Sequence, residues 1–250
     1  MAWPTVVGVV VIGATAGFLG GLFGKGGSAI ATPLLGAIGI RPLAAVASPL
    51  PSTIPGTIVA AFAYRRAGIM NWRVIRWSAL VGVPATVVGA YTTRWIGGGA
   101  LVSGTELLLV ALGLRFLVFP GDPHEIAAVP PAFRTRIVAV ALVVGLLSGL
   151  LANAGGFLLA PLYVLVLRIP LKQAFGSSLV VAAALAVPGT IVHAALGHID
   201  WTIVALFGGA SIPFSSIGAR TALRTNAVHL ERLYGAGLAL IGAGTLALSL

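Results

Sequence analysis

Residues 20–40, GGLFGKGGSAIATPLLGAIGI, form an apolar stretch that several glycines and one lysine, Lys25, interrupt. The chain contains only two lysines, so a charge inside an apolar run needs an explanation. A uniform membrane helix avoids both a buried charge and this many glycines. The pattern therefore predicts two helical segments separated by a glycine-rich break.

The composition around this stretch is that of an integral membrane protein. Of 250 residues, 58% are hydrophobic and 8% are charged. Apolar runs of about 18 residues or more recur along the chain, each long enough to cross a bilayer as a helix. Since every backbone group in lipid must be satisfied within its own segment, we predict an all-α, polytopic transmembrane helical bundle.

Charge and cysteine content exclude several other classes. The net charge of +10 would suggest nucleic acid in a soluble protein, but here the arginines stand between apolar runs and are expected to set orientation. The chain has no cysteine, so disulfides and cysteine-based metal sites are excluded. We expect no cofactor, no metal and no nucleic-acid partner.

Ten apolar segments can be counted, and they fall into two similar halves. The segments are 3–24, 26–40, 44–64, 75–96, 99–119, 136–153, 155–168, 174–195, 201–219 and 232–249. Prolines and charges in 120–135 predict a cytoplasmic linker between a first membrane repeat, 1–119, and a second, 136–250.

The matches between the halves run in order at a near-constant separation. GGSAIATPLL (26–35) resembles AGGFLLAPLY (154–163), GIMNW (68–72) resembles GHIDW (197–201), and GVPATVVGA (82–90) resembles SIPFSSIGA (211–219). Each half holds five segments, and an odd number turns the second copy over in the membrane. The sequence therefore predicts two inverted repeats.

The positive charges predict the orientation. With this segment count, one face collects Arg65, Arg66, Arg73, Arg76, Arg115, Arg134, Arg136, Arg168, Lys172, Arg220, Arg224 and Arg232. The opposite face collects only Arg41 and Arg94. The arginine-rich face is expected to be cytoplasmic, which places both termini outside.

The second segment of each half is too short to span. Residues 26–40 give about 22 Å of helix, against a hydrocarbon core of about 30 Å. Each short segment follows a glycine-rich break, FGKGG (23–27) or ANAGG (152–156). We expect re-entrant or broken helices whose tips meet near the midplane, where such paired interruptions indicate a transporter's binding site.

A helix start at such a tip presents unpaired N–H groups and partial positive charge, which favour an anion. The candidate anion-binding residues are Gly24, Lys25, Gly26, Gly27 and Ser28 in the first half and Asn153, Gly155 and Gly156 in the second. Two alternatives stay open: the glycines can serve close helix packing, and the lysine can reach an interface if both segments span.

The third segment of each half carries hydroxyls beside prolines. Ser48, Ser52, Thr53, Ser177 and Ser178 are candidates to line a polar pathway. The alternative is that each hydroxyl bonds its own helix backbone. Glu106 and His193 are the other ionisable residues in apolar segments, and both lie toward segment ends, where an interfacial position is expected.

Several motifs together are similar to those of a known family. They are GLFGKGGSAIATPLL, AAVASPL, YRRAGIMNW and GVPATVVGAYTTRWI in the first half, and their counterparts ANAGGFLLAPL, AFGSSL and LGHIDW in the second. On these motifs the chain resembles the TauE/SafE permeases, also called sulfite exporters or the toluene sulfonate uptake permease group. The likeness covers nearly the whole chain. It implies a prokaryotic inner-membrane carrier of sulfur-containing anions such as sulfite, sulfoacetate or other sulfonates.

The combined expectation is a transporter of a small sulfur-containing oxyanion that alternates access around a midplane site, with proton or ion coupling left open. Its partners are a small anion and the lipid bilayer. An anion channel of the same architecture is the alternative. An intramembrane enzyme using Ser177 or Ser178 with His193 is disfavoured, because 16 residues of helix separate Ser177 from His193 by about 24 Å.

Overall fold

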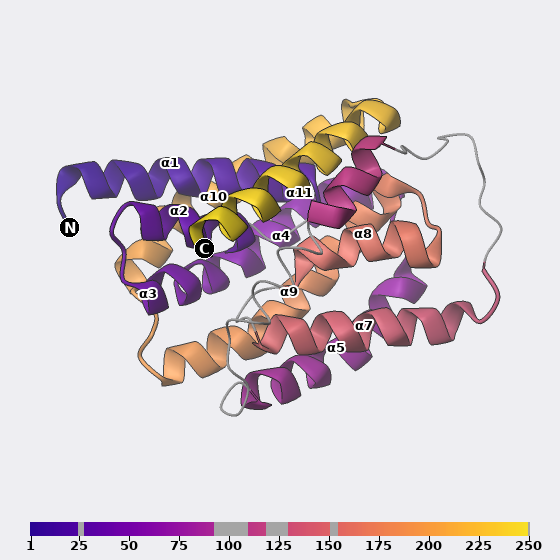
Figure 1. Ribbon diagram of the computed structural model, residues 1–250, viewed down its shortest axis with the longest axis horizontal. Coiled ribbons are helices and arrows are strands. Elements are labelled where there is room, and N and C mark those ends of the chain that lie inside the picture. The colour runs from indigo at the N-terminus through magenta and orange to yellow at the C-terminus, as the bar shows by residue number, and fades with distance from the viewer. Residues whose placement is uncertain (25–27, 93–109, 119–129, 151–154, 250) are drawn as a thin grey trace.

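The computed structural model describes residues 1–24, 28–92, 110–118, 130–150 and 155–249, without the side chains of 28–30, 241, 242 and 245–249 (Figure 1). The helices are α1 (Trp3–Leu22), α2 (Ser28–Ala37), α3 (Pro42–Ala47), α4 (Pro49–Arg66), α5 (Trp72–Thr92), α7 (Phe133–Leu150), α8 (Gly156–Leu167), α9 (Leu171–Ala195), α10 (Trp201–Arg224) and α11 (Ala227–Ser249). Residues 110–118 are also helical. The described residues as a whole contain no strand. The predicted all-α class is confirmed.

Within the described residues, six helical stretches are long and apolar enough to cross a membrane. They are Trp3–Leu22, Pro42–Arg66, Trp72–Thr92, Phe133–Leu150, Leu171–Ala195 and Trp201–Arg224. The α2 and α8 helices, with 10 and 12 residues, are the short second segments of the two halves. The prediction of a polytopic helical bundle with short second segments is therefore confirmed.

The surface of the protein is apolar and its interior contains polar groups, as expected for a protein that lies in a bilayer. Large apolar side chains point outward, with Leu80 66% and Leu240 74% exposed. Hydroxyl groups lie inside, and Ser48 and Ser177 are fully buried. An outward apolar belt is stable when the surroundings are hydrocarbon, and the buried hydroxyls then find partners among the helices.

The principal helices pack in the order α1, α10, α4, α9, α5, α7. Figure 1 shows α1 beside α10 along one edge and α5 beside α7 along the other, with α4 and α9 between them. Gly176 of α9 lies against Tyr64 of α4, and Gly189 of α9 lies against Leu50, so these two central helices run antiparallel. In the sequence pairing α1 corresponds to α7, α10 to α5 and α4 to α9. Exchanging each helix for its counterpart therefore reverses this order without changing which helices are neighbours.

Small residues allow the two outer pairs to approach closely. Gly13, Gly17 and Gly21 recur every fourth residue and therefore share one face of α1. A Cβ on Gly13 would lie 2.7 Å from the carbonyl oxygen of Phe207, and Gly17 and Gly21 similarly meet Ser211 and Ser215. Because any side chain would push the backbones apart, glycine is required along this parallel crossing.

The other pair, α5 and α7, crosses in the same way, and the contacts involve the residues that correspond to those of α1 and α10 in the sequence pairing. Gly145 lies against Gly82, whose match in the pairing is Ser211, and Gly149 lies against Thr86. Corresponding residues thus make corresponding contacts across the two halves. The boundaries of the repeats at 119 and 136 stay a prediction, because residues 119–129 lie outside the described part of the chain.

Positive side chains tie helices together at one end of the bundle. Arg136 donates to the carbonyl oxygen of Val166 at 3.1 Å, and Lys172 donates to that of Leu223 at 2.9 Å. The Arg134 guanidinium stacks 3.8 Å from the ring centroid of Trp77. This is the arginine-rich face expected to be cytoplasmic, and its side of the membrane stays a prediction.

Candidate functional site

The first glycine-rich break, residues 23–27, follows α1, and Gly24 is its first glycine. The φ of +66° at Gly24 is a conformation that glycine adopts without strain. A Cβ at Gly24 would also collide with Phe175 of α9. The Ser178 hydroxyl donates to the Gly24 carbonyl oxygen at 2.6 Å, so α9 holds the break in place from the side.

Several predicted anion-binding residues in this break cannot be placed. Lys25, Gly26, Gly27 and Asn153 lie outside the described residues, as does the side chain of Ser28, the first residue of α2. Their assignment to the site stays a prediction. What the structure does place is the backbone on either side of each break.

The second break ends at Gly155, which has a φ of +64° and immediately precedes α8. Its carbonyl oxygen accepts from the N–H groups of Leu158 at 3.1 Å and Leu159 at 3.3 Å, which starts the helix. Gly156 is buried, so the first N–H groups of α8 lie inside the bundle. This is the local geometry that the anion-site hypothesis requires.

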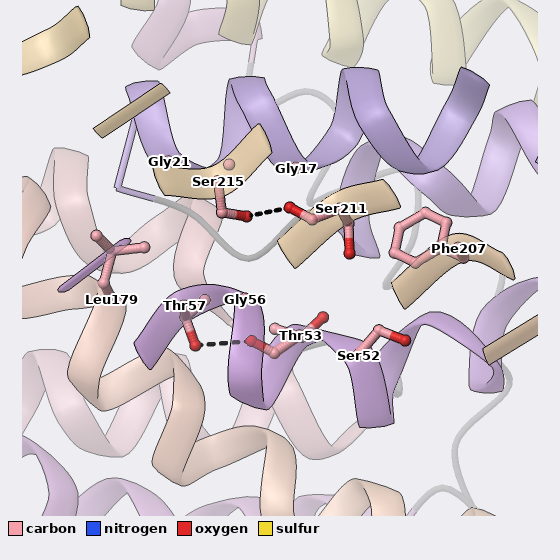
Figure 2. A pocket seen from close by; sticks show the side chains of 11 residues that line it. Gly17, Gly21, Ser52, Thr53, Gly56, Thr57, Leu179, Phe207, Ser211 and Ser215 are labelled. Carbon is pink, nitrogen blue, oxygen red and sulfur yellow. Dashed lines mark hydrogen bonds between the residues drawn. The ribbon is translucent and has the colours of Figure 1, made fainter. Parts of the chain in front are cut away.

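A small cavity between α1, α4 and α10, here called cavity A, has a volume of about 10 Å³, which is room for about one water molecule (Figure 2). Its lining residues are Gly17, Gly20, Gly21, Ser52, Thr53, Gly56, Thr57, Leu179, Phe207, Ser211 and Ser215. Figure 2 shows the hydroxyl residues of α4 on one side and those of α10 on the other. Ser52 and Thr53, two predicted pathway residues, are therefore brought to one cavity.

The hydroxyls of cavity A donate hydrogen bonds to backbone carbonyl oxygens. Thr53 bonds the oxygen of Pro49 at 3.1 Å, Thr57 bonds that of Thr53 at 2.7 Å, and Ser215 bonds that of Ser211 at 2.8 Å. Ser52 instead reaches across to the carbonyl oxygen of Val204 on α10 at 3.2 Å. For Thr53 the two interpretations of the sequence coexist, because it bonds its own helix and also lines the cavity.

A second small cavity, here called cavity B, lies between α5, α7 and α9 and has a volume of about 20 Å³, which is room for about one water molecule in this conformation. It is lined by Leu50, Thr86, Ala90, Ser148, Gly149, Leu185, Gly189, Val192 and His193. A Cβ on Gly155 would lie 3.1 Å from the Ser148 side chain and 3.2 Å from that of Leu185. The start of α8 therefore adjoins cavity B.

The two cavities occupy related places in the two halves. Gly21, Ser215 and Leu179 of cavity A correspond in the sequence pairing to Gly149, Thr86 and Leu50 of cavity B. Their chemistry differs, because cavity A has five hydroxyl residues whereas cavity B has Thr86, Ser148 and one imidazole. The chain therefore contains a matched pair of small polar cavities with unequal linings.

The predicted pathway residues Ser48 and Ser177 make contacts between the halves. The Ser48 hydroxyl accepts from the N–H of Asp200 at 3.0 Å, and the Ser177 hydroxyl accepts from that of Asn71 at 3.0 Å. Neither serine is among the residues that line cavity A or cavity B. In this conformation both serines act as ties between the halves, and their place in a pathway stays a prediction.

His193 lies in the last turn of α9 and pairs with His198 in the following turn, with 3.2 Å between the two Nδ1 atoms. The helix is continuous from Leu171, so Ser177 and His193 lie on separate turns and cannot act as nucleophile and base. No group of three or more His, Cys, Asp or Glu side chains in the described residues is placed to hold a metal ion.

Sequence reasoning missed two features of this region. One is the partnership of His193 with His198, which a spacing of five residues across a helix end does not reveal. The other is the close crossing of α1 and α10, whose signal was the recurrence of Gly13, Gly17 and Gly21 at every fourth position. Glu106, the other ionisable candidate, lies outside the described residues.

Comparison with known proteins places these features in a family. The model of the sulfite exporter TauE/SafE family matches residues 9–245. A probable membrane transporter protein of Xylella fastidiosa strain Temecula1 is 28% identical over 243 residues, covering 94% of this chain and 92% of the relative. The probable membrane transporter protein YunE of Bacillus subtilis is 23% identical and covers 87% of each chain. No solved structure matches.

Proposed function

This chain belongs to the TauE/SafE family of membrane transporters, and on that premise we propose that it carries a small sulfur-containing oxyanion across the membrane by alternating access. Sulfite, sulfoacetate and other organosulfonates are the proposed substrate class. The family match supports the class through its description as a sulfite exporter family. The local geometry supports an anion through the helix starts at the two breaks.

One observation carries the proposal: each half places a small polar cavity beside the helix that ends or begins at its glycine-rich break. Gly21 of cavity A lies three residues before Gly24, and Ser148 of cavity B adjoins Gly155. Backbone N–H groups at a helix start attract an anion, and glycine lets the anion approach the backbone. This argument applies to cavity B, which adjoins the start of α8, whereas cavity A adjoins the C-terminal end of α1. Lys25 would supply a full positive charge at the first break.

The packing of the halves supports a carrier. The central helices α4 and α9 cross antiparallel at the contact of Tyr64 with Gly176, and the outer helices of each half pack on a helix of the other. Rocking of one half against the other about this crossing would open one cavity while closing its counterpart. Transporters built from inverted repeats alternate access in this way around a fixed site.

A thermal-shift screen of the purified protein tests the substrate class. A ligand that binds only the folded state raises the apparent melting temperature. We expect stabilisation by sulfite, thiosulfate, sulfoacetate or taurine, with sulfate included as the fully oxidised member and simple carboxylates as controls. Stabilisation by carboxylates alone would contradict the sulfur-anion assignment.

A further inference from the structure

The two histidines at the end of α9 form a unit that shares a proton. Their Nδ1 atoms are 3.2 Å apart and their ring centroids 5.4 Å apart. At this distance one Nδ1 must carry a hydrogen and the other must accept it. When the accepting nitrogen takes up a proton, the hydrogen bond is lost and a positive charge appears on the pair.

That charge would arise at the wall of cavity B. His193 is half-buried and lines the cavity together with the hydroxyl residues Thr86 and Ser148. Among the described residues that line cavity B, His193 is the one whose side chain can gain a positive charge by taking up a proton. A charge placed at a cavity wall inside a low-dielectric bundle acts strongly on a ligand within that cavity.

The surrounding elements offer this charge little compensation. Asp200, two residues after His198, directs its carboxylate to the start of α10, where it accepts from the N–H groups of Thr202 at 2.9 Å and Ile203 at 3.3 Å. From α5 the cavity takes Thr86 and Ala90, and from α4 it takes the apolar Leu50, whereas the α5 side chain Tyr91 is exposed. Among the described residues that line cavity B there is no carboxylate.

We propose that cavity B binds an anion together with a proton, which the His193–His198 pair takes up. The proton ends on the Nδ1 atom that had been the acceptor, and the anion in the cavity supplies the missing counter-charge. Each partner therefore strengthens the binding of the other by the same factor. This coupling rests on the proposed anion transport and names its driving ion as the proton.

The pairing of the halves places the coupling in one half only. The counterpart of His193 is Tyr64, a buried residue whose hydroxyl donates to the Gly21 carbonyl oxygen at 3.4 Å. A tyrosine hydroxyl keeps its proton at neutral pH. None of the described residues that line cavity A gains a charge by taking up a proton, so we assign proton uptake to cavity B.

Titration calorimetry of sulfoacetate binding to the full-length protein tests the coupling. Sulfoacetate keeps one charge state throughout the neutral range, because both its acidic groups titrate far below it. Titrations at pH 7 in buffers of different ionisation enthalpy count the protons taken up for each anion bound. We expect net proton uptake, and a Kd that rises by up to roughly tenfold per pH unit above neutrality.

One double variant and a matched control assign the proton to the pair. His193→Asn/His198→Asn keeps polar side chains at both positions but removes both imidazoles, so we expect weaker sulfoacetate binding that takes up no proton. His229→Gln changes an exposed histidine at the start of α11 and should take up protons as the wild type does. Proton uptake by the double asparagine variant equal to the wild-type value would overturn the assignment.

The calorimetry separates failure of the coupling from failure of the function. Wild-type protein that binds sulfoacetate without proton uptake contradicts the coupling and leaves anion transport standing. Wild-type protein that binds no sulfoacetate contradicts the proposed substrate class and the coupling with it. Both decisions rest on the wild type, so they hold even if the double variant fails to fold.

Discussion

The hydroxyl of Ser48 accepts a hydrogen bond from the backbone N–H of Asp200 at 3.0 Å, across 152 residues of sequence. The same bond recurs between Ser177 and Asn71, also at 3.0 Å. Ser48 corresponds to Ser177, and Asp200 to Asn71, in the pairing of the halves. Each half thus uses a buried serine to hold the turn that precedes a long helix of the other half.

Replacing either serine should destabilise the protein. Ser48→Ala and Ser177→Ala each remove the acceptor of a partly buried N–H, so we expect a loss of about 1–3 kcal/mol in the free energy of unfolding. The two bonds share no partner, and the effects should be nearly additive in the double variant. Thermal melting in detergent measures the loss. Thr221→Ala, at an exposed hydroxyl, is the control, and equal melting of all variants would contradict the tie.

Two glycines on α10 should respond oppositely to alanine. Gly218 faces α1, where a Cβ would press into the backbone of Phe18 and sit 2.8 Å from the N of Leu22. Gly218→Ala should therefore lower stability by about 1–3 kcal/mol or more. Gly209 has nothing within 4 Å of the corresponding position, so Gly209→Ala should be neutral or stabilising by up to about 1 kcal/mol.

Melting temperatures of this matched pair, measured at one detergent concentration, decide whether the α1–α10 crossing is as close as described. If Gly218→Ala has the same melting temperature as Gly209→Ala, the two helices stand further apart than the structure shows.

The two lysines of the chain allow a matched test of the first break. Lys25→Ala should abolish or strongly reduce anion uptake into proteoliposomes while membrane insertion stays intact, because it removes the full positive charge proposed at the anion site. Lys172→Ala is the control, since this lysine bonds the end of α10 through Leu223. Normal uptake by the Lys25 variant would remove that residue from the site.

The hydroxyl of Thr53 can be removed with little change in shape. Thr53→Val deletes a hydroxyl that bonds only its own helix in the structure and lines cavity A. If the cavity belongs to the pathway, the initial uptake rate should fall several-fold while the melting temperature stays close to wild type. Thr221→Val removes an exposed hydroxyl with the same kind of bond and should transport normally. Equal rates for the two variants would exclude Thr53 from the pathway.

The sequence predicted the helical class and the segments well, because apolar length is the dominant signal in a membrane protein. The segment predicted at 174–195 is α9, Leu171–Ala195, and the one predicted at 201–219 is α10, Trp201–Arg224. Helix α9 begins three residues earlier than predicted, and α10 ends five residues later. These ends are charged or polar, so hydropathy does not mark them although the helical hydrogen bonding continues.

The candidate site was less accessible to sequence reasoning. Ser48 and Ser52 looked alike as hydroxyls beside prolines, yet Ser48 ties the halves and Ser52 lines cavity A. Their different roles depend on which residues of α10 lie opposite, and helix periodicity alone does not specify that. The same limit applies to His198, which becomes a partner of His193 only because the chain turns back after α9.

Counterflow of labelled sulfoacetate in proteoliposomes tests anion transport most directly. Vesicles loaded with unlabelled sulfoacetate should transiently accumulate the labelled anion above its equilibrium level, and the rate should saturate with concentration, because a carrier exposes its site to one side at a time. Flux that neither saturates nor shows counterflow, or that appears as large unitary currents, would contradict alternating access and indicate an anion channel of the same architecture.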